Sequence, residues 1–246
     1  MKRFLCLALL LPLLFCAPLP GPQFKECPCT HTDPQKQLYN QVLTELIEHH
    51  FYNYYLPESE SETINKSIII SKGIVVNTSK IDRLEAHYQN QLFNHKSRFK
   101  TIYLDTVSRK SFAGSIDLHL NSPGIDSRFV AKINALLSQV APHGEAAAAA
   151  QLMTIQTVMA PTDFQLCTAR IAYAAPRAPH EYAREQDAHQ FGRVRFSNIV
   201  FNANKTQALV SYDWHCGGKC GLGELLIVHK VAGRWRIKHA EMIWIS

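Results

Sequence analysis

The side chains best suited to chemistry lie close together near the C-terminal end of the sequence. Asp213, His215, Cys216 and Cys220 occur in a single glycine-rich stretch. Two thiols at this spacing can approach each other, because glycine residues between and after them adopt positive φ angles without strain. In an oxidising compartment the spacing favours a disulfide between Cys216 and Cys220, which would fasten a connection between two strands.

The same stretch has a second interpretation as a metal site. The thiolates of Cys216 and Cys220, the imidazole of His215 and the carboxylate of Asp213 are all zinc ligands. Zinc ribbons usually need two cysteine pairs, however, and only one pair of this kind occurs in this region. We therefore expect no metal and no other cofactor, with zinc as the alternative.

A row of cations near the C-terminus is a further candidate for ligand binding. Arg234, Arg236 and Lys238 alternate along the last predicted strand, so they share one face of it. Such a row can hold an anionic ligand or a membrane headgroup. The alternative, which we favour, is a solvated sheet face whose charges discourage pairing with other strands.

A search for established catalytic motifs limits the enzyme hypothesis. His180-Glu181 does not match the zinc-protease motif, because Arg184 stands where the second histidine belongs. The segment 221–223 lacks the third glycine of a dinucleotide-binding loop. The sequence also contains no nucleophile elbow and no phosphate-binding loop. These observations favour a protein that is not an enzyme.

The elements that must position the candidate residues are strands. Alternating apolar and polar residues and turn signals predict four strands, at residues 194–202, 206–215, 223–231 and 234–245. In the second strand, Asp213 and His215 share one face, while Tyr212 and Trp214 share the other. Ala232-Gly233 marks a tight turn before the last strand. The C-terminal region is therefore predicted to be an antiparallel β-meander.

Upstream of the meander the sequence predicts helices mixed with strands. Helices are expected from Asp33-Pro34 to about Tyr55, after Thr78, and along residues 128–140, where Asp126 or Ser127 leads in the helix. The β-branched run at 67–76 predicts a strand, and residues 99–106 are expected to form another. The alanines at 146–150 either extend a helix or form a spacer, and residues 161–189 are expected to be a long loop. The predicted fold class is thus α+β, with the C-terminal sheet at its centre.

The predicted organisation runs from an export segment to one main domain. Its parts are a signal segment at 1–17, a tether at 18–33, a mixed α/β region at 34–141, a loop-rich or inserted segment at 142–190 and the antiparallel sheet at 191–246. The sheet is expected to form a single domain with residues 34–141.

The start of the chain predicts export. Lys2 and Arg3 precede an uncharged, leucine-rich run that is too short to span a bilayer, which is the layout of a signal peptide. The run extends from Phe4 to Phe15, and the segment Leu13–Cys16 resembles the lipobox of bacterial lipoproteins. Phe15 departs from that motif, since a small residue normally precedes the lipidated cysteine. We therefore expect a protein of the periplasm or cell surface, with Cys16 as a lipidation candidate and a lipid as its only membrane attachment.

Composition limits the partners and the redox state. Apolar residues make up 46% of the chain and charged residues 19%, which suffices for a sizeable core. The formal charge of +6 falls to +4 when Lys2 and Arg3 are removed, and the remaining cations are scattered. Nucleic acid is therefore not an expected partner. The cysteines beyond the signal segment are odd in number, which predicts one or two disulfides and a leftover thiol.

A set of short motifs occupies the last part of the chain. They are Phe196–Asn202, Lys205–Val210, Cys216-Gly217, Cys220-Gly221, Gly233–Trp235 and Trp244–Ser246. Together they resemble a C-terminal block of uncharacterised exported bacterial proteins, a resemblance that implies no activity. The hairpin at 233–237 is also similar to the last strands of nuclear-transport-factor-2-like domains, although the order of elements upstream does not fit that family.

The favoured hypothesis is a non-enzymatic envelope protein that binds an unknown partner or ligand or has a structural role. It rests on the export signal and on the lack of a recognisable catalytic set. The alternative is an envelope enzyme or a metal-binding protein with its site near Asp213, His215, Cys216 and Cys220.

Overall fold

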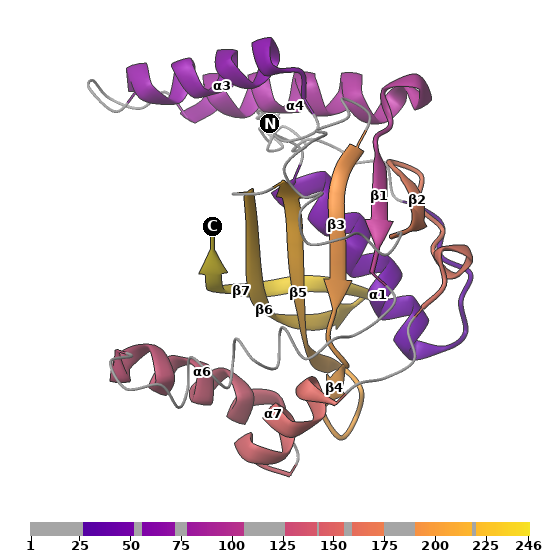
Figure 1. Cartoon of the computed structure of the whole chain (residues 1–246), viewed down its shortest axis with the longest axis vertical. Coiled ribbons are helices and arrows are strands. Elements are labelled where there is room, and N and C mark those ends of the chain that lie inside the picture. Colours follow the sequence, from indigo (N-terminus) through magenta and orange to yellow (C-terminus); the bar gives the residue numbers. More distant parts are fainter. Residues whose placement is uncertain are drawn as a thin grey trace, which may run out of the picture.

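The computed structural model describes residues 27–51, 56–71, 78–105, 126–141, 143–154, 159–174, 190–217 and 220–246. The protein is α+β, as predicted from the sequence, with helices around a mixed seven-stranded sheet (Figure 1). The expected signal segment at 1–17, with the lipidation candidate Cys16, and the first part of the expected tether, 18–26, lie outside the described residues.

The sheet joins strands from distant parts of the chain. Its members are β1 (Thr101–Leu104), β2 (Arg170–Tyr173), β3 (Gln190–Phe196), β4 (Val200–Phe201), β5 (Gln207–Gly217), β6 (Cys220–Val231) and β7 (Arg234–Ile245). Their order is β2-β1-β3-β5-β6-β7, and β4 pairs with β5. The strand β1 runs parallel to both β2 and β3, whereas all other pairs are antiparallel.

The antiparallel meander at the C-terminus is confirmed. The strand β6 pairs with β5 on one side and β7 on the other, which explains why its residues are apolar on both faces. The connection between β6 and β7 is a tight turn in which Ala232 and Gly233 have φ angles of 48° and 81°. Two successive positive φ angles match the right-handed twist of the strands that they join.

Two stretches of sheet differ from the sequence prediction. The strand predicted at 194–202 is interrupted, because β3 ends at Phe196 and β4 begins at Val200. In the break, the backbone N–H of Ser211 donates to Ser197 Oγ at 2.9 Å, so a side chain takes the place of a ladder carbonyl. The second difference is β2, a short strand within the segment predicted to be loop-rich. It is held by parallel pairing to β1, a long-range contact with no local signal.

One face of the sheet packs against the first helix. Helix α1 (Pro34–Glu45) begins at Asp33, whose carboxylate accepts hydrogen bonds from the first free amides, and it continues as a π-helix, η1 (Leu46–His50). Figure 1 shows α1 crossing the sheet behind its central strands. Leu38 and Val42 of α1 lie in the same buried cluster as Tyr212 and Trp214 of β5. The face of β5 predicted to be apolar therefore forms the main core.

The other face is covered at one end by two helices. Helices α6 (Ser127–Val140) and α7 (Glu145–Met153) contribute Leu136 and Leu152 to a second core with Leu209 of β5 and Leu225 of β6. The alanine run at 146–150 is thus helical. Helix α6 begins after Asp126, one of the two residues expected to lead it in, and the Asp126 carboxylate accepts a hydrogen bond from the backbone N–H of Arg128.

A helical pair lies at the end of the sheet shown uppermost in Figure 1. It consists of α3 (Glu58–Ser71) and α4 (Thr78–Asn94), followed by a short 3-10 turn, η2 (Lys96–Arg98). The strand predicted at 67–76 is wrong for 67–71, which end α3, while 72–77 lie outside the described residues. Acidic residues in the first turn and the Lys66–Glu62 ion pair at 2.8 Å favour the helix despite the β-branched propensity, and α3 lies beside α4.

Candidate functional site

Cys216 and Cys220 form a disulfide at the end of the β5–β6 hairpin. Gly217 pairs with Cys220 in the ladder, and His215 pairs with Gly221. The bond therefore fixes the ends of both strands beside His215. Since both sulfur atoms are used in this bond, neither can act as a thiolate ligand in this state. Within the described part of the chain, no group of three or more His, Cys, Asp or Glu side chains is arranged to hold a metal ion.

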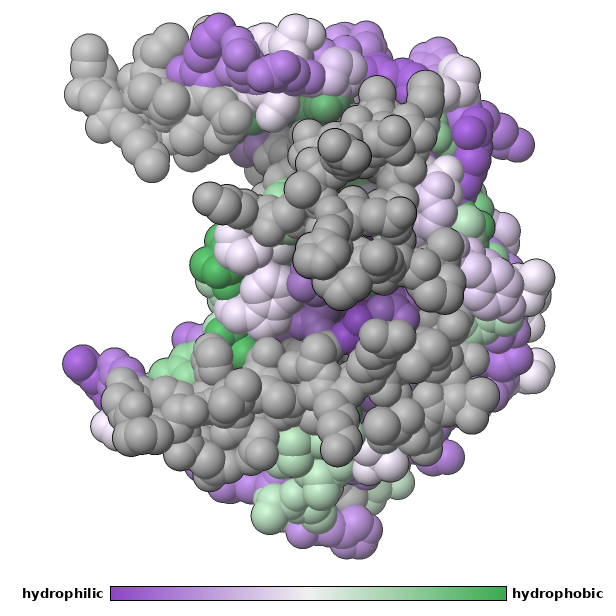
Figure 2. All heavy atoms as spheres, in the orientation of Figure 1, coloured by the Kyte–Doolittle hydropathy of each residue, from purple (hydrophilic) through white to green (hydrophobic). Residues whose placement is uncertain are grey.

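Asp213 and His215 lie on the sheet face opposite α1, on the part of β5 beyond the apolar contacts with α6 and α7. The neighbouring strand β3 places Arg195 opposite Asp213 and Arg193 opposite His215. Residues directly opposite each other on antiparallel strands project to the same face, so the four side chains share one surface. Figure 2 views this side of the molecule and shows hydrophilic surface over the central strands.

A carboxylate from a third strand completes the charged group. Asp105, directly after β1, is 2.5 Å from Arg195 Nη2 and 3.9 Å from Arg193 Nη1 through its Oδ2 atom. The side chains of Asp105, Arg195 and Arg193 are only 13%, 14% and 16% exposed. These are largely desolvated charges, in contrast to the exposed ion pairs elsewhere on the surface.

Trp244 of β7 joins the group because two glycines leave room for its indole. A Cβ atom on Gly223 would lie 2.0 Å from Trp244 Nε1, and one on Gly221 would lie 2.9 Å from Trp244 Cη2. The ring therefore lies against the backbone of β6. There, Nε1 donates a hydrogen bond of 2.7 Å to Asp213 Oδ1, and the ring stacks on His215 with centroids 5.0 Å apart.

We term the resulting group the sheet-face cluster. Its members are Asp105, Arg193, Arg195, Asp213, His215 and Trp244. They come from the end of β1 and from β3, β5 and β7, so four stretches of chain must be in register before the cluster exists.

The protonation of the two titratable members on β5 follows from their surroundings. Burial is the main cause that lowers the pKa of His215, and the positive charges of Arg195 and Arg193 lower it further, whereas Asp105 raises it. Burial raises the pKa of Asp213, against the opposing effects of the Trp244 hydrogen bond and Arg195. His215 is consequently a neutral imidazole at neutral pH, in a positive electrostatic potential.

The predicted row of cations on β7 is less regular than the sequence suggests. The pairing of β6 and β7 shifts register at Lys238, so the alternation ends there. Arg236 is exposed and lies near Glu45 of α1. Burial raises the pKa of Glu45, while a hydrogen bond from the backbone N–H of Ile237 and the charge of Arg236 lower it. Arg234 is half-buried at the start of the strand.

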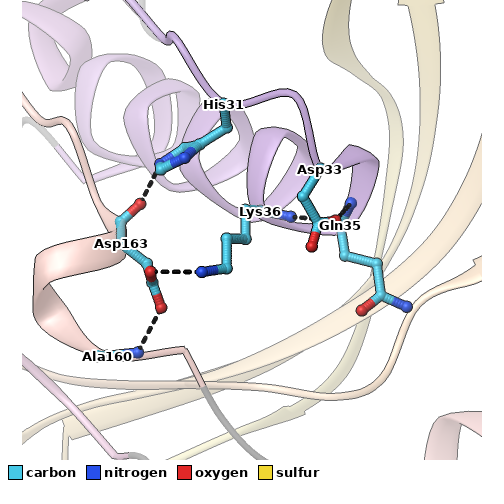
Figure 3. Close-up of polar contacts among 6 residues, drawn as sticks. All are labelled: His31, Asp33, Gln35, Lys36, Ala160 and Asp163. Atoms are coloured by element: carbon cyan, nitrogen blue, oxygen red, sulfur yellow. Dashed lines mark hydrogen bonds and ion pairs between the residues drawn. The ribbon is translucent and has the colours of Figure 1, made fainter.

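A second polar group fastens the start of the described chain to the turn η3 (Pro161–Asp163), as Figure 3 shows. The Asp163 carboxylate accepts from Lys36 Nζ at 2.7 Å and from the backbone N–H of Ala160 at 2.9 Å. His31 Nε2 contacts the Asp163 backbone oxygen. The Lys36 hydrogen bond is the main cause that lowers the pKa of Asp163. These groups satisfy one another, so we assign this cluster a structural role.

The same attachment contains a disulfide that the sequence did not assign. Cys27 is bonded to Cys167, 140 residues further along the chain. Close by, Thr30 and the side chain of Gln165 exchange two hydrogen bonds of 2.7 and 2.8 Å. Residues 27–33, predicted to belong to a tether, are therefore attached to the fold. Cys29 is a half-buried thiol, so the described cysteines form two disulfides and leave one thiol.

Sequence reasoning identified only part of the sheet-face cluster. Asp213 and His215 were candidates, but Arg193, Arg195, Asp105 and Trp244 were not. The alternation Arg193-Val194-Arg195 at the start of the strand predicted from residue 194 was a usable signal, because it places two cations on one face once the strand extends to Arg193. No sequence signal pointed to Asp105, since its proximity to Arg195 depends on the parallel pairing of β1 with β3.

Comparison of the chain with models of protein families, with curated protein sequences and with solved structures gave no match. Of the helices that the structure describes, none has the length and apolar character needed to cross a membrane.

Proposed function

We propose that this is an exported cell-envelope protein with a non-enzymatic binding role in the periplasm or at the cell surface. The charged and then apolar residues at the N-terminus support export. The two disulfides are consistent with an oxidising compartment, where such bonds persist. A lipid on Cys16 would add a membrane anchor.

The observation that carries the binding role is the sheet-face cluster. The same face of the sheet is filled with leucine and isoleucine under α6 and α7, whereas beyond them it holds charged groups that are mostly withdrawn from water. Buried ion pairs contribute little net stability, because desolvation offsets their attraction. Their placement is better explained by recognition of a ligand than by the needs of the fold.

Binding fits the geometry better than catalysis or metal binding does. Asp213 accepts a hydrogen bond from Trp244, and His215 stacks on the same indole. These contacts hold both side chains in fixed orientations, as in a recognition surface. The disulfide occupies the thiols that a zinc site would require.

The proposal can be tested by NMR on the exported, disulfide-bonded protein. Sugars, amino acids, organic acids and amines would be added separately, while signals of the β5 amides and the Trp244 indole N–H are followed. We expect one of these classes to shift signals of the sheet-face cluster in the wild type and to lose this effect in Arg193→Gln. Arg128→Gln is the matched control, since Arg128 is 92% exposed on α6.

Two results would contradict the proposal. One is that no class of molecule shifts the cluster, or that shifts are equal in the wild type and Arg193→Gln. The other concerns export: full-length, unprocessed protein with reduced cysteines in the cytosolic fraction would remove the envelope role.

A further inference from the structure

Three cysteines lie close together where the start of the described chain is attached to the fold. Cys27 is bonded to Cys167, with 5.3 Å between their Cα atoms, and Cys29 follows Cys27 by two residues as a thiol. Cys27 is buried and Cys29 is half-buried, whereas Pro28 between them is exposed. Such alternation is typical of an extended chain, in which every second side chain points the same way. The Cys29 thiol and the disulfide therefore share the side of the segment that faces the fold.

The contacts of this segment show that it runs antiparallel to residues 163–167. As the residue number rises along the segment, that of its partner falls: the contacts join Cys27 to Cys167, Thr30 to Gln165 and His31 to Asp163. In this register Cys29 lies opposite Gln165 and is the diagonal neighbour of Cys167. Diagonal Cα atoms of antiparallel chains are about 7–8 Å apart, and a disulfide requires roughly 6.8 Å or less. A shift on the order of 1 Å would therefore bring Cys29 within bonding reach of Cys167.

We infer that Cys29 is an alternative partner of Cys167, so that the covalent attachment of this segment passes from Cys27 to Cys29 by thiol–disulfide exchange. The thiolate of Cys29, which has lost its proton to the solvent, attacks Cys167 Sγ. The Cys29–Cys167 bond forms as the bond to Cys27 breaks, and Cys27 leaves as a thiolate that takes up a proton. One disulfide and one thiol are present before and after the step, so it requires no oxidant or reductant.

The non-covalent contacts determine which of the two bonds predominates. While Cys27 holds the bond, Thr30 and Gln165 exchange two hydrogen bonds of 2.7 and 2.8 Å. Movement of Cys29 toward Cys167 would displace Thr30 from these contacts. Cys27–Cys167 is therefore the major isomer, and Cys29–Cys167 is the minor one. The exchange changes which cysteine presents a thiol and moves the point of attachment two residues closer to α1.

The first experiment locates the thiol in the wild-type, exported protein. The protein is incubated at alkaline pH and quenched in acid, because only the thiolate attacks and acid stops the exchange. After alkylation of the thiol, tandem mass spectrometry of the unreduced peptides shows whether Cys27 or Cys29 is blocked. We expect a minor fraction with Cys27 blocked and Cys29 bonded to Cys167. Gln165→Ala should increase this fraction by about threefold or more, because it removes the hydrogen bonds of the major isomer. Arg128→Gln on α6 should leave it unchanged.

The second experiment removes the major partner. In Cys27→Ser we expect Cys29 to bond to Cys167, so that neither of these two residues can be alkylated without reduction. The matched control is Pro28→Cys in a chain that also carries Cys27→Ser and Cys29→Ser. Its new thiol is nearer to position 27 along the chain but on the exposed side, so most of it should remain open to alkylation.

Each experiment can overturn the exchange. The wild-type result does so if Cys29 alone is blocked both before and after Gln165→Ala, a test that leaves every cysteine in place. The second experiment does so if Cys29 and Cys167 both stay reduced in Cys27→Ser, or if the thiol at position 28 bonds to Cys167 as completely as Cys29 does. None of these results depends on ligand binding by the sheet-face cluster, so the exchange and the binding role are tested separately.

Discussion

Gly221 and Gly223 determine the position of Trp244, and through it the orientation of Asp213 and His215. Any side chain at either glycine would meet the indole or, at 223, the Asp213 carboxylate, which is 2.8 Å from the expected Cβ position. The short glycine motif after Cys220 is thus explained by packing rather than by phosphate binding. The geometry of the site therefore requires glycine, which has no side chain, at positions 221 and 223.

Replacement of Gly223 by alanine should displace the indole from β6. We expect a loss of about 1–3 kcal/mol in unfolding free energy, which is typical of an overfilled site. Gly233→Ala is the control, because it adds only backbone strain of about 1 kcal/mol at a positive φ, with open space around it. Denaturant unfolding measures both, and the Trp244 indole N–H signal should shift only in Gly223→Ala. An unshifted signal in that variant would contradict the packing.

The residues of the site were predictable only where the signal was local. Asp213, His215, Cys216 and Cys220 lie within one short stretch, so their spacing alone predicted that they are close in space. Arg195 meets Asp105 across 90 residues, and no sequence pattern specifies this contact. The partner of Cys167 was equally inaccessible, since spacing does not determine long-range disulfide connectivity.

Helix α1 packs in the core and also covers an edge of the sheet. The side chain of Gln41 accepts a hydrogen bond of 2.7 Å from the backbone N–H of Trp235, and Glu45 accepts one of 3.1 Å from Ile237. The strand β7 is the last in the sheet order, so these N–H groups lie on an edge that has no further strand. Exposed edges of this kind invite pairing with other chains.

The Gln41→Ala substitution should uncover part of this edge. We expect a loss of about 1–2 kcal/mol, because a buried backbone donor loses its partner, together with increased self-association. Gln37→Ala, one turn earlier in α1, is the matched control: its exposed contact to Lys230 Nζ at 3.2 Å should contribute about 0.5 kcal/mol or less. Thermal unfolding and sedimentation at several protein concentrations provide the measurements. Equal behaviour of the two variants would exclude a role of Gln41 in edge protection.

Elements with strong local signals were predicted well. The cap at Asp33 marked the start of α1, the start of α6 was located to Asp126 or Ser127, and period-two patterning identified β5, β6 and β7. The incorrect predictions concern segments whose secondary structure depends on tertiary contacts. Residues 67–71 include three consecutive β-branched isoleucines but extend a helix, and β2 is a strand only because β1 lies beside it.

At the scale of the whole molecule, two disulfides differ greatly in the length of chain that they close. Cys27–Cys167 spans 140 residues and attaches the beginning of the described chain next to β2, whereas Cys216–Cys220 closes four. The first therefore restrains the unfolded chain as a whole, and the second restrains one hairpin.

Removal of each disulfide by paired Cys→Ser substitutions should give different losses of stability. Loop-closure entropy predicts about 5 kcal/mol for Cys27–Cys167 and about 2 kcal/mol for Cys216–Cys220, as upper values. The short bond should matter more for the site, because it adjoins His215. Denaturant unfolding compares the stabilities, and the NMR signal of the Trp244 indole N–H, whose ring stacks on His215, compares the sites. A larger stability loss from the Cys216–Cys220 pair would contradict this assignment of roles.

The packing of α1 on β7 has a consequence for biosynthesis. Gln41 and Trp235 are separated by 194 residues, so the ribosome completes α1 long before it makes β7, the strand whose edge α1 covers. Until the later strands have been made, the apolar face of α1 has no sheet to pack against, and contacts so distant in sequence form slowly. A fragment that ends before β7 should therefore expose the apolar side chains of α1 and be prone to aggregation.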